Sequence, residues 1–292
     1  MEGLFEQLCK FTYLPINHNV IPFRSPMDGI EPRPIIRVEN KSITRELDTV
    51  SVESPLSIKI LDKNGLESSL GLLMRTPGDD SNLIRGLLYC EGIIQSESDI
   101  LKINIFQDYN QVVLSDNVIF NPEEHNRKLT MTSSCGICGK ESISNLIHIH
   151  GPELSENIFI DIETISNSIS SLKSGQTFFS TTGGTHACAR LDFSGSLISI
   201  SEDIGRHNAM DKLIGNALKE NDLPVKDEIV IVSGRASFEL VQKSLKAGFP
   251  IMIALGAPST LAVDLALEHG MTLIGFAKKN RITIFSGSKR II

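Results

Sequence analysis

The chain has 292 residues, of which 41% are hydrophobic and 22% are charged. This composition excludes a disordered or fibrous protein and predicts one large or two ordinary globular domains. The net charge of −7, from 28 Lys and Arg against 35 Asp and Glu, argues against nucleic-acid binding. We find no apolar run of about 18 residues and no signal-peptide pattern, so we expect a cytoplasmic protein that does not span a membrane.

The first half of the chain predicts a small α+β domain over residues 31–128, preceded by a loosely ordered arm at residues 1–30. Residues 50–61 and 69–76 read as the two strands of a hairpin around the turn KNG. A helix is expected from Asp79–Ser81 to Gly92, followed by short strands at 100–106 and 111–116. The polar segment 121–128 is the best linker candidate.

The second half, residues 129–292, predicts a three-layer α/β domain. Apolar strands alternate with helices of about a dozen residues, a pattern typical of parallel βαβ units covered by helices on both faces. The expected strands are 196–202, 228–234, 250–256, 271–277 and 281–287, and the expected helices are 206–221, 236–248 and 259–270.

Polar residues follow three of these strands, in the segments SEDIGRH, SGRAS and LGAPS. Ligands of such sheets bind beyond the carboxyl ends of the strands, where glycines and helix starts favour anions. Arg206 and Arg235 add positive charge there. His186 and His207 each follow a glycine-containing turn and could donate a hydrogen bond or act as a general acid. An ordinary turn would explain any one of these segments alone.

The connection GFAKKNRITIFSG places Lys278, Lys279 and Arg281 in a tight turn between two strands. An exposed hairpin turn commonly carries lysine, which is the simpler explanation. The alternative is a clamp for a phosphate or a nucleotide base, with Phe276 as a stacking surface.

Two of the five cysteines, Cys135 and Cys138, lie three positions apart in MTSSCGICGKES. A thiolate is the reactive form of cysteine, and a second cysteine at this spacing can stabilise it or form a disulfide with it. Gly136 and Gly139 predict a mobile loop. The pair could hold a metal, exchange disulfides or carry sulfur, and two small residues without a chemical role are the structural alternative.

The metal and disulfide interpretations fit less well. A zinc site would need Cys135, Cys138, Cys188 and a histidine, but zinc deaminases show H-x-E followed by P-C-x-x-C. Here Cys188 replaces the glutamate, and the CxxC lies upstream without a preceding proline. Thioredoxin-like proteins place the motif after a short βαβ start, whereas residues 1–134 precede it here. Because the zinc-deaminase pattern is incomplete, we expect no structural metal.

Eight segments in order, from residue 48 to 288, resemble the formate dehydrogenase accessory sulfurtransferase (FdhD) family. They are VSVESPLSIKI, TPGDDSNLIRGLLYCEGII, SSCGICG, FFSTTGGTHACA, EDIGRHNAMDKLIG, SGRASFELVQK, GAPSTLAVDLA and GFAKKNRITIFSG. Each motif is weak alone, but eight in the same order are specific.

The resemblance implies a sulfur carrier that is loaded by a cysteine desulfurase. It would pass the sulfur to the molybdenum or tungsten bis-guanine-dinucleotide cofactor, for formate dehydrogenase. Cys135 would carry the persulfide and Cys138 would assist. The family's cofactor-contacting segment matches Phe276, Ala277, Lys278, Lys279, Asn280 and Arg281; our other candidate ligand residues are Gly184, His186, Arg206, His207 and Arg235. The resemblance also implies a cytidine-deaminase-like large domain without zinc, and a homodimer.

Two alternatives stay open at this point. The chain could be a chaperone that only holds the nucleotide cofactor while its cysteines guard against oxidation, or a zinc-binding deaminase-like protein. Cys188 departs from the family pattern, which commonly has a small apolar residue there. This leaves open whether a third thiol shares the sulfur.

Overall fold

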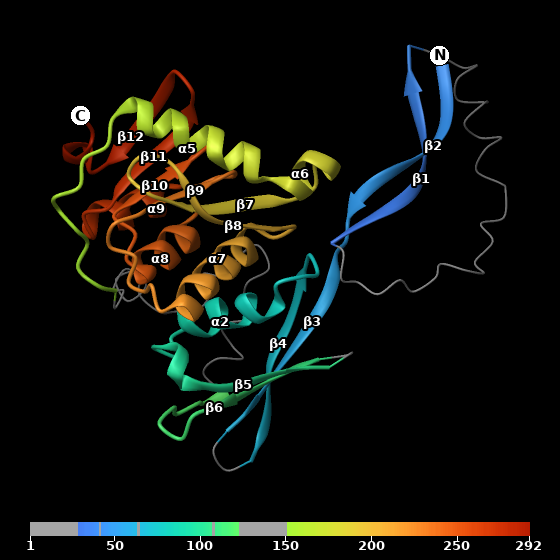
Figure 1. Cartoon of the computed structure of the whole chain (residues 1–292), viewed down its shortest axis with the longest axis vertical. Coiled ribbons are helices and arrows are strands. Elements are labelled where there is room, and N and C mark those ends of the chain that lie inside the picture. Colours follow the sequence, from blue (N-terminus) through green and yellow to red (C-terminus); the bar gives the residue numbers. More distant parts are fainter. Residues whose placement is uncertain (1–28, 41, 63–64, 107–108, 123–150) are drawn as a thin grey trace.

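The computed structural model describes residues 29–40, 42–62, 65–106, 109–122 and 151–292. Residues 1–28 of the predicted arm lie outside these ranges, and the whole CxxC segment lies outside them too. Within the described residues the protein is a mixed α/β structure with three sheets (Figure 1).

The largest sheet has six strands in the order β12-β11-β10-β9-β7-β8. Its strands are β7 His186–Leu191, β8 Leu197–Asp203, β9 Ile229–Val232, β10 Ile251–Ala254, β11 Thr272–Lys278 and β12 Arg281–Ser286. Strands β9, β10 and β11 are parallel, whereas β7, β8 and β12 each pair antiparallel with their neighbours. The expectation of parallel βαβ units is therefore confirmed for β9–β11. Strand β8 also runs parallel to β9, but it is not its neighbour, because β7 inserts between them.

Helices cover both faces of this sheet (Figure 1). Helix α5 Ile162–Gly175 lies on one face, and α7 Arg206–Glu220, α8 Phe238–Ala247 and α9 Thr260–Glu268 lie on the other. Two short helices complete this part of the chain: α6 Thr177–Thr182 precedes β7, and the 3-10 helix η3 Ser288–Arg290 follows β12. Alternate residues of one strand enter different cores: Ile229 and Ile231 pack towards α5, and Val230 and Val232 pack towards α7 and α8. The three-layer arrangement expected from continuous apolar strands is thus present.

The second sheet has four strands in the order β4-β3-β6-β5. Its elements are β3 Ser54–Leu61, β4 Glu67–Arg75, α2 Asp80–Cys90, the short 3-10 helix η2 Glu97–Asp99, β5 Ile100–Ile105 and β6 Asn110–Leu114. The predicted hairpin, helix and two short strands are all confirmed. Helix α2 packs between this sheet and α7, and one hydrophobic core runs through all of them. The domain boundaries near residues 30 and 128 stay a prediction.

Helices α2 and α7 cross with their backbones in contact. A Cβ atom on Gly86 would lie 1.8 Å from the carbonyl oxygen of Asp211, and one on Gly215 would lie 1.8 Å from that of Asn82. Only glycine allows this approach. The crossing fixes the position of α7, whose first turn reaches the edge of the large sheet.

A two-stranded ribbon, β1 Ile30–Glu39 and β2 Ser42–Ser51, projects away from both sheets (Figure 1). Sequence analysis did not predict it. Paired residues put Ile36, Val38 and Leu47 on one face, and all three side chains are exposed. The base of the ribbon touches α6, where Ser51 Oγ lies 2.7 Å from Thr182 Oγ1.

Candidate functional site

The strand directions bring the predicted ligand residues to one edge of the large sheet. Strands β8, β9 and β10 end there, and β7 begins there because it runs antiparallel to β8 and β9. His186, the first residue of β7, pairs with Asp203 at the end of β8, and Cys188 pairs with Val232 at the end of β9. His186 therefore lies beside the turns that carry Arg206 and Gly234.

A buried carboxylate fixes the turn before α7. Asp203 lies 2.8 Å from the ammonium of Lys212 and accepts hydrogen bonds from the backbone N–H groups of Gly205 at 2.8 Å and Thr76 at 3.1 Å. Asn208 donates to the same carboxylate at 3.0 Å. Both members of the ion pair are almost fully buried. This network holds the first turn of α7, and so places Arg206 and His207 at the edge.

Arg206 combines a positive charge with an unused hydrogen-bond donor. Its Nε is buried and has no hydrogen-bond partner among the described residues. A buried donor left unpaired costs about 1–3 kcal/mol, so such a group favours a ligand that accepts a hydrogen bond. Because the side chain is cationic, an anion such as a phosphate fits best.

His186 stands next to this guanidinium and is half-buried. Burial, then the charge of Arg206, lowers its pKa below the ordinary value, while Asp203 opposes the shift. The imidazole is therefore uncharged at neutral pH. A smaller share of the ring is then protonated and available as a general acid, and at neutral pH the ring is mainly a neutral hydrogen-bonding group.

His207 is the second histidine of the site. Its Nε2 lies 3.3 Å from Ser237 Oγ and 3.3 Å from a carboxylate oxygen of Glu239, both at the start of α8. Burial, followed by the charges of Arg206 and Lys243, lowers the pKa of His207 to about 3. His207 is thus neutral too, and the expected general-acid role is not supported for it. Sequence reasoning missed Glu239, since nothing in its spacing links it to His207.

The glycine turns after β9 and β10 stack on each other at the same edge. Gly256 N–H donates to the Gly234 carbonyl at 2.9 Å, and Phe276 N–H donates to the Gly256 carbonyl at 3.0 Å. A Cβ atom on Gly256 would lie 2.9 Å from the Gly234 oxygen. Glycine is therefore required there by the packing of the turns, and Arg235 stands exposed between them.

The hairpin at the end of β11 forms a second group at this edge. Phe276 has the left-handed φ of 50°, unusual for an aromatic residue, and the residue is 45% exposed. Lys278, Lys279, Asn280 and Arg281 are also exposed, whereas Ala277 is buried and its side chain faces the core under α5. Ala277 can therefore reach a ligand only through its backbone.

The two groups are separated along the edge. Strand β11 lies three positions from β7 in the sheet, which at the usual strand spacing corresponds to about 14 Å. The structure thus brings His186, Arg206, His207 and Arg235 together, and places the Phe276–Arg281 hairpin further along. Gly184 lies outside both groups, in the exposed turn between α6 and β7, where a Cβ atom would approach Ser51 Oγ to 2.8 Å.

Cys135 and Cys138 lie outside the described residues, so their roles stay a prediction. Among the described residues the free cysteines are Cys90 and Cys188. Cys188 is 1% exposed, and burial, followed by the nearby Asp211, raises the pKa of its thiol well above the ordinary value. A buried thiol that stays protonated is a poor nucleophile. The structure therefore argues against Cys188 as a third carrier of sulfur.

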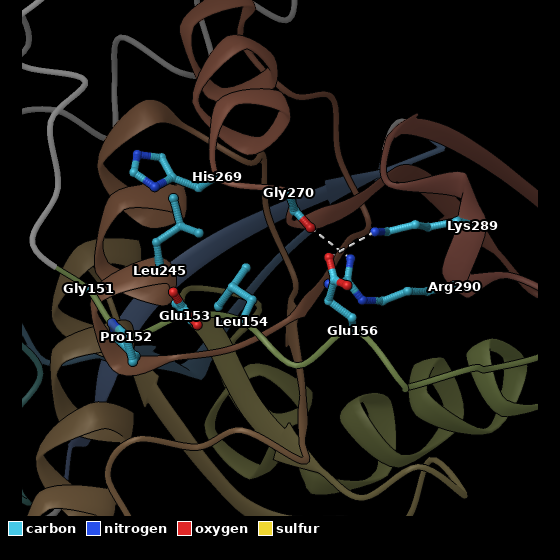
Figure 2. Close-up of a pocket in the computed structure, with 10 residues that line it drawn as sticks. All are labelled: Gly151, Pro152, Glu153, Leu154, Glu156, Leu245, His269, Gly270, Lys289 and Arg290. Carbon is cyan, nitrogen blue, oxygen red and sulfur yellow. Dashed lines mark hydrogen bonds and ion pairs between the residues drawn. The ribbon is translucent and has the colours of Figure 1, made fainter.

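A cavity lies at the opposite edge of the sheet, where α8 and α9 end (Figure 2). It measures about 460 Å³ and is lined by Gly151, Pro152, Glu153, Leu154, Glu156, Leu245, His269, Gly270, Lys289 and Arg290. Arg290 donates to the carbonyls of Gly270 at 2.7 Å and Ser155 at 2.8 Å, and Lys289 pairs with Glu156. These contacts tie the chain end to residues 155–156, and Arg290 is fully used by them.

The described part of the chain shows neither a metal-binding cluster nor a membrane-spanning helix. There, no three His, Cys, Asp or Glu side chains gather in a way that could hold a metal ion. Nor does any helix in these ranges have the length and apolar character needed to cross a membrane.

The sequence profile of the FdhD/NarQ family matches residues 51–292. The chain belongs to the FdhD/NarQ family. Several FdhD/NarQ relatives carry the name sulfur carrier protein FdhD. The relative from Nocardia farcinica is 38% identical over 272 residues, which cover 89% of this chain and 94% of the relative. The relative from Picrophilus torridus is 42% identical over 260 residues, 88% of this chain and 96% of the relative.

The fold of this FdhD/NarQ protein is also found in a crystal structure. A formate dehydrogenase accessory protein from Desulfotalea psychrophila superposes with a TM-score of 0.73 at 22% sequence identity. The match covers 90% of this chain and 100% of that one. At this identity the comparison establishes the mixed α/β fold alone.

Proposed function

We propose that this protein is a sulfur carrier for formate dehydrogenase maturation. It would accept sulfur from a cysteine desulfurase and deliver it to the molybdenum, or tungsten, bis-guanine-dinucleotide cofactor as its bound substrate. Membership of the FdhD/NarQ family and the names of the relatives support this proposal. The structural observation that carries it is the buried Nε of Arg206 at the edge with the glycine turns, which has no hydrogen-bond partner within the described ranges.

The cofactor suits the edge because it is long and carries several phosphates. Arg206 would hold one phosphate, helped by the neighbouring glycine turns, where backbone N–H groups can approach an anion. Exposed Arg235 adds a second charge. The length of about 14 Å between β7 and β11 is suited to a dinucleotide rather than to a single phosphate.

The hairpin at the end of β11 would hold another part of the same ligand. The exposed ring of Phe276 offers a stacking surface for a base, and Lys278, Lys279 and Arg281 offer charge for phosphate. Residues held in strained conformations are often part of a binding site, and the left-handed φ of Phe276 is such a case. Asn280 would contribute hydrogen bonds.

The loading step is a thiol exchange. The thiolate of Cys135 attacks the terminal sulfur of the desulfurase persulfide, a new S–S bond forms on Cys135, and the desulfurase cysteine leaves as a thiolate. No net oxidation occurs. Cys135 then carries a perthiolate, which keeps the transferred sulfur at the oxidation level it had on the donor.

The delivery step needs two electrons, because the carried sulfur must become sulfide to bind a metal. The thiol of Cys138 supplies them. Its sulfur attacks the inner sulfur of the Cys135 perthiolate, the two cysteines form a disulfide, and the outer sulfur leaves with the proton as hydrosulfide. A dithiol reductant would then restore both thiols.

The loading step can be tested with a cysteine desulfurase, cysteine labelled with ³⁵S, and mass spectrometry of the intact protein. The wild-type chain should gain the mass and label of one sulfur on Cys135, and Cys135→Ala should gain neither. A chain that never takes up sulfur, although it binds the cofactor, would instead be a chaperone that only holds the cofactor. Stoichiometric zinc in the purified protein would favour the zinc-binding alternative.

Further parts of the proposal come from the resemblance or, for the cytoplasmic location, from the sequence patterns alone. These are the homodimer, the cytoplasmic location, the cytidine-deaminase-like character of the large domain and direct work with formate dehydrogenase. The accessory protein from Desulfotalea psychrophila is named for that enzyme, which supports the last of them.

A further inference from the structure

The two helices that start at the ligand edge are joined by a ladder of polar side chains. His207 and Asp211 stand on α7, and Glu239 and Lys243 stand on α8. Lys243 donates to both carboxylate oxygens of Asp211 at 2.6 and 2.7 Å, and both side chains are buried. Lys243 also lies 3.8 Å from Glu239, whose other oxygen lies 3.3 Å from His207 Nε2.

This ladder decides which nitrogen of His207 carries the proton. His207 is neutral, so one ring nitrogen has a hydrogen and the other a lone pair. A lone pair on Nε2 would face the negative oxygen of Glu239 at 3.3 Å. Ser237 Oγ, also 3.3 Å away, can accept a hydrogen from Nε2. The proton therefore belongs on Nε2.

Nδ1 is then a hydrogen-bond acceptor. The described residues make no hydrogen bond to it, and the side chain is 27% exposed. Arg206, the preceding residue, presents the opposite character, a cationic donor. The first turn of α7 thus offers a donor for an anion and, next to it, an acceptor that an anion cannot use.

We infer that Glu239 is a positioning residue that keeps His207 in the Nε2–H form. Nδ1 of His207 then accepts a hydrogen bond from a hydroxyl or N–H group of the ligand, next to the anionic group that Arg206 holds. This inference rests on the proposed function. A nucleotide has such donors in its ribose hydroxyls and in the N–H groups of guanine, whereas pyrophosphate at high pH has none.

The variant Glu239→Gln tests this assignment sharply. An amide has one oxygen and one NH₂ group, and the ammonium of Lys243 attracts the oxygen. The NH₂ group then faces His207, which must accept at Nε2 and carry its proton on Nδ1. The variant should therefore reverse the tautomer while the side-chain volume stays the same.

The tautomer is read from the ¹³C and ¹⁵N chemical shifts of the His207 ring. In the same samples, at a pH high enough to deprotonate pyrophosphate fully, guanosine diphosphate and inorganic pyrophosphate are titrated calorimetrically into the full-length protein. In Glu239→Gln we expect the Nδ1–H form and guanosine diphosphate binding weakened by about tenfold, the usual effect of one mismatched hydrogen bond. Pyrophosphate binding should stay within about twofold, since it uses Arg206. The control Asp264→Asn, an exposed carboxylate on α9, should change neither.

Three results would overturn the inference: an Nδ1–H tautomer in the wild-type protein, unchanged guanosine diphosphate binding in Glu239→Gln, or equal weakening of both ligands. Equal weakening would mean that Glu239 acts only on the structure of the site. If the wild-type protein binds neither ligand, the proposed function itself fails, and that outcome is distinct from the other three.

Discussion

The side chains at the ligand edge differ mainly in how the protein surrounds them. Arg235 is exposed, whereas Arg206 has a buried Nε to which no described residue offers a hydrogen-bond acceptor. His186 and His207 both have lowered pKa values because they are buried next to positive charge. These environments differ more than the residue types do, and the buried Nε of Arg206 is the group on which the proposed anion binding depends.

Cys188 provides a test at this scale. Its thiol is buried and its pKa is raised, so Cys188→Ala should take up labelled sulfur from the desulfurase as fully as the wild-type chain. Sulfur loading measured by intact-mass spectrometry checks this. A loss of loading in Cys188→Ala, with the fold intact by circular dichroism, would show that a third thiol takes part.

The pKa of His207 makes a second prediction, about stability. The folded-state pKa is about 3 against an ordinary 6.5, so between these values the unfolded chain binds one more proton than the folded one. The free energy of unfolding should therefore fall as the pH drops, by about 2–3 kcal/mol from about pH 7 to about pH 4 for this group. In His207→Gln the fall should be smaller by that amount. Urea unfolding across this pH range measures it, and an unchanged slope would contradict the pKa.

At the scale of elements, the strands and helices with clear periodicity were predictable and the others were not. The strands 228–234 and 250–256 contain the continuous apolar runs IVIV and IMIAL, and each strand ends at a glycine, which favours a buried strand. Helix α5 is rich in serine and β-branched residues, which favour helix weakly, and it is held by Ile165, Ile169 and Leu172 packing on the sheet. Its existence depends on a tertiary contact that the local sequence does not contain.

The same limit applies to the site. Arg206 and His207 were found because glycine turns after apolar strands have a known place in α/β sheets. Glu239 and Asp203 were missed, because their effect on His207 and Arg206 depends on how α7 lies against α8 and against the loop at Thr76. That relation is set by packing between segments far apart in the chain.

The crossing of α2 and α7 gives the prediction at this scale. Helix propensity alone would make Gly215→Ala more stable by about 1 kcal/mol. The new Cβ would instead lie 1.8 Å from the Asn82 oxygen, so we expect a loss of at least about 3 kcal/mol from overpacking. Chemical unfolding measures the loss, with Lys219→Ala at an exposed position of α7 as the control. A stabilised Gly215→Ala variant would refute the close approach.

At the scale of the whole molecule, the two larger sheets act together on one site. The four-stranded sheet ends at Thr76, which donates to Asp203 through its N–H and accepts from Lys212 through its carbonyl at 2.9 Å. The four-stranded sheet therefore helps to hold the turn that carries Arg206 in place. At the other end of the large sheet Arg290 donates to the carbonyls of Gly270 and Ser155, and the cavity there lies apart from the ligand edge.

The most direct test of this arrangement is calorimetric titration of guanosine diphosphate into the wild-type protein and two variants. Arg206→Ala removes the unpartnered donor at the ligand edge, and Lys289→Ala removes a cation at the opposite edge. We predict that the Arg206→Ala variant binds at least about tenfold more weakly, as expected for a lost charge-assisted hydrogen bond, and that Lys289→Ala binds like the wild type. Equal binding by wild type and Arg206→Ala, or a loss confined to Lys289→Ala, would contradict the account.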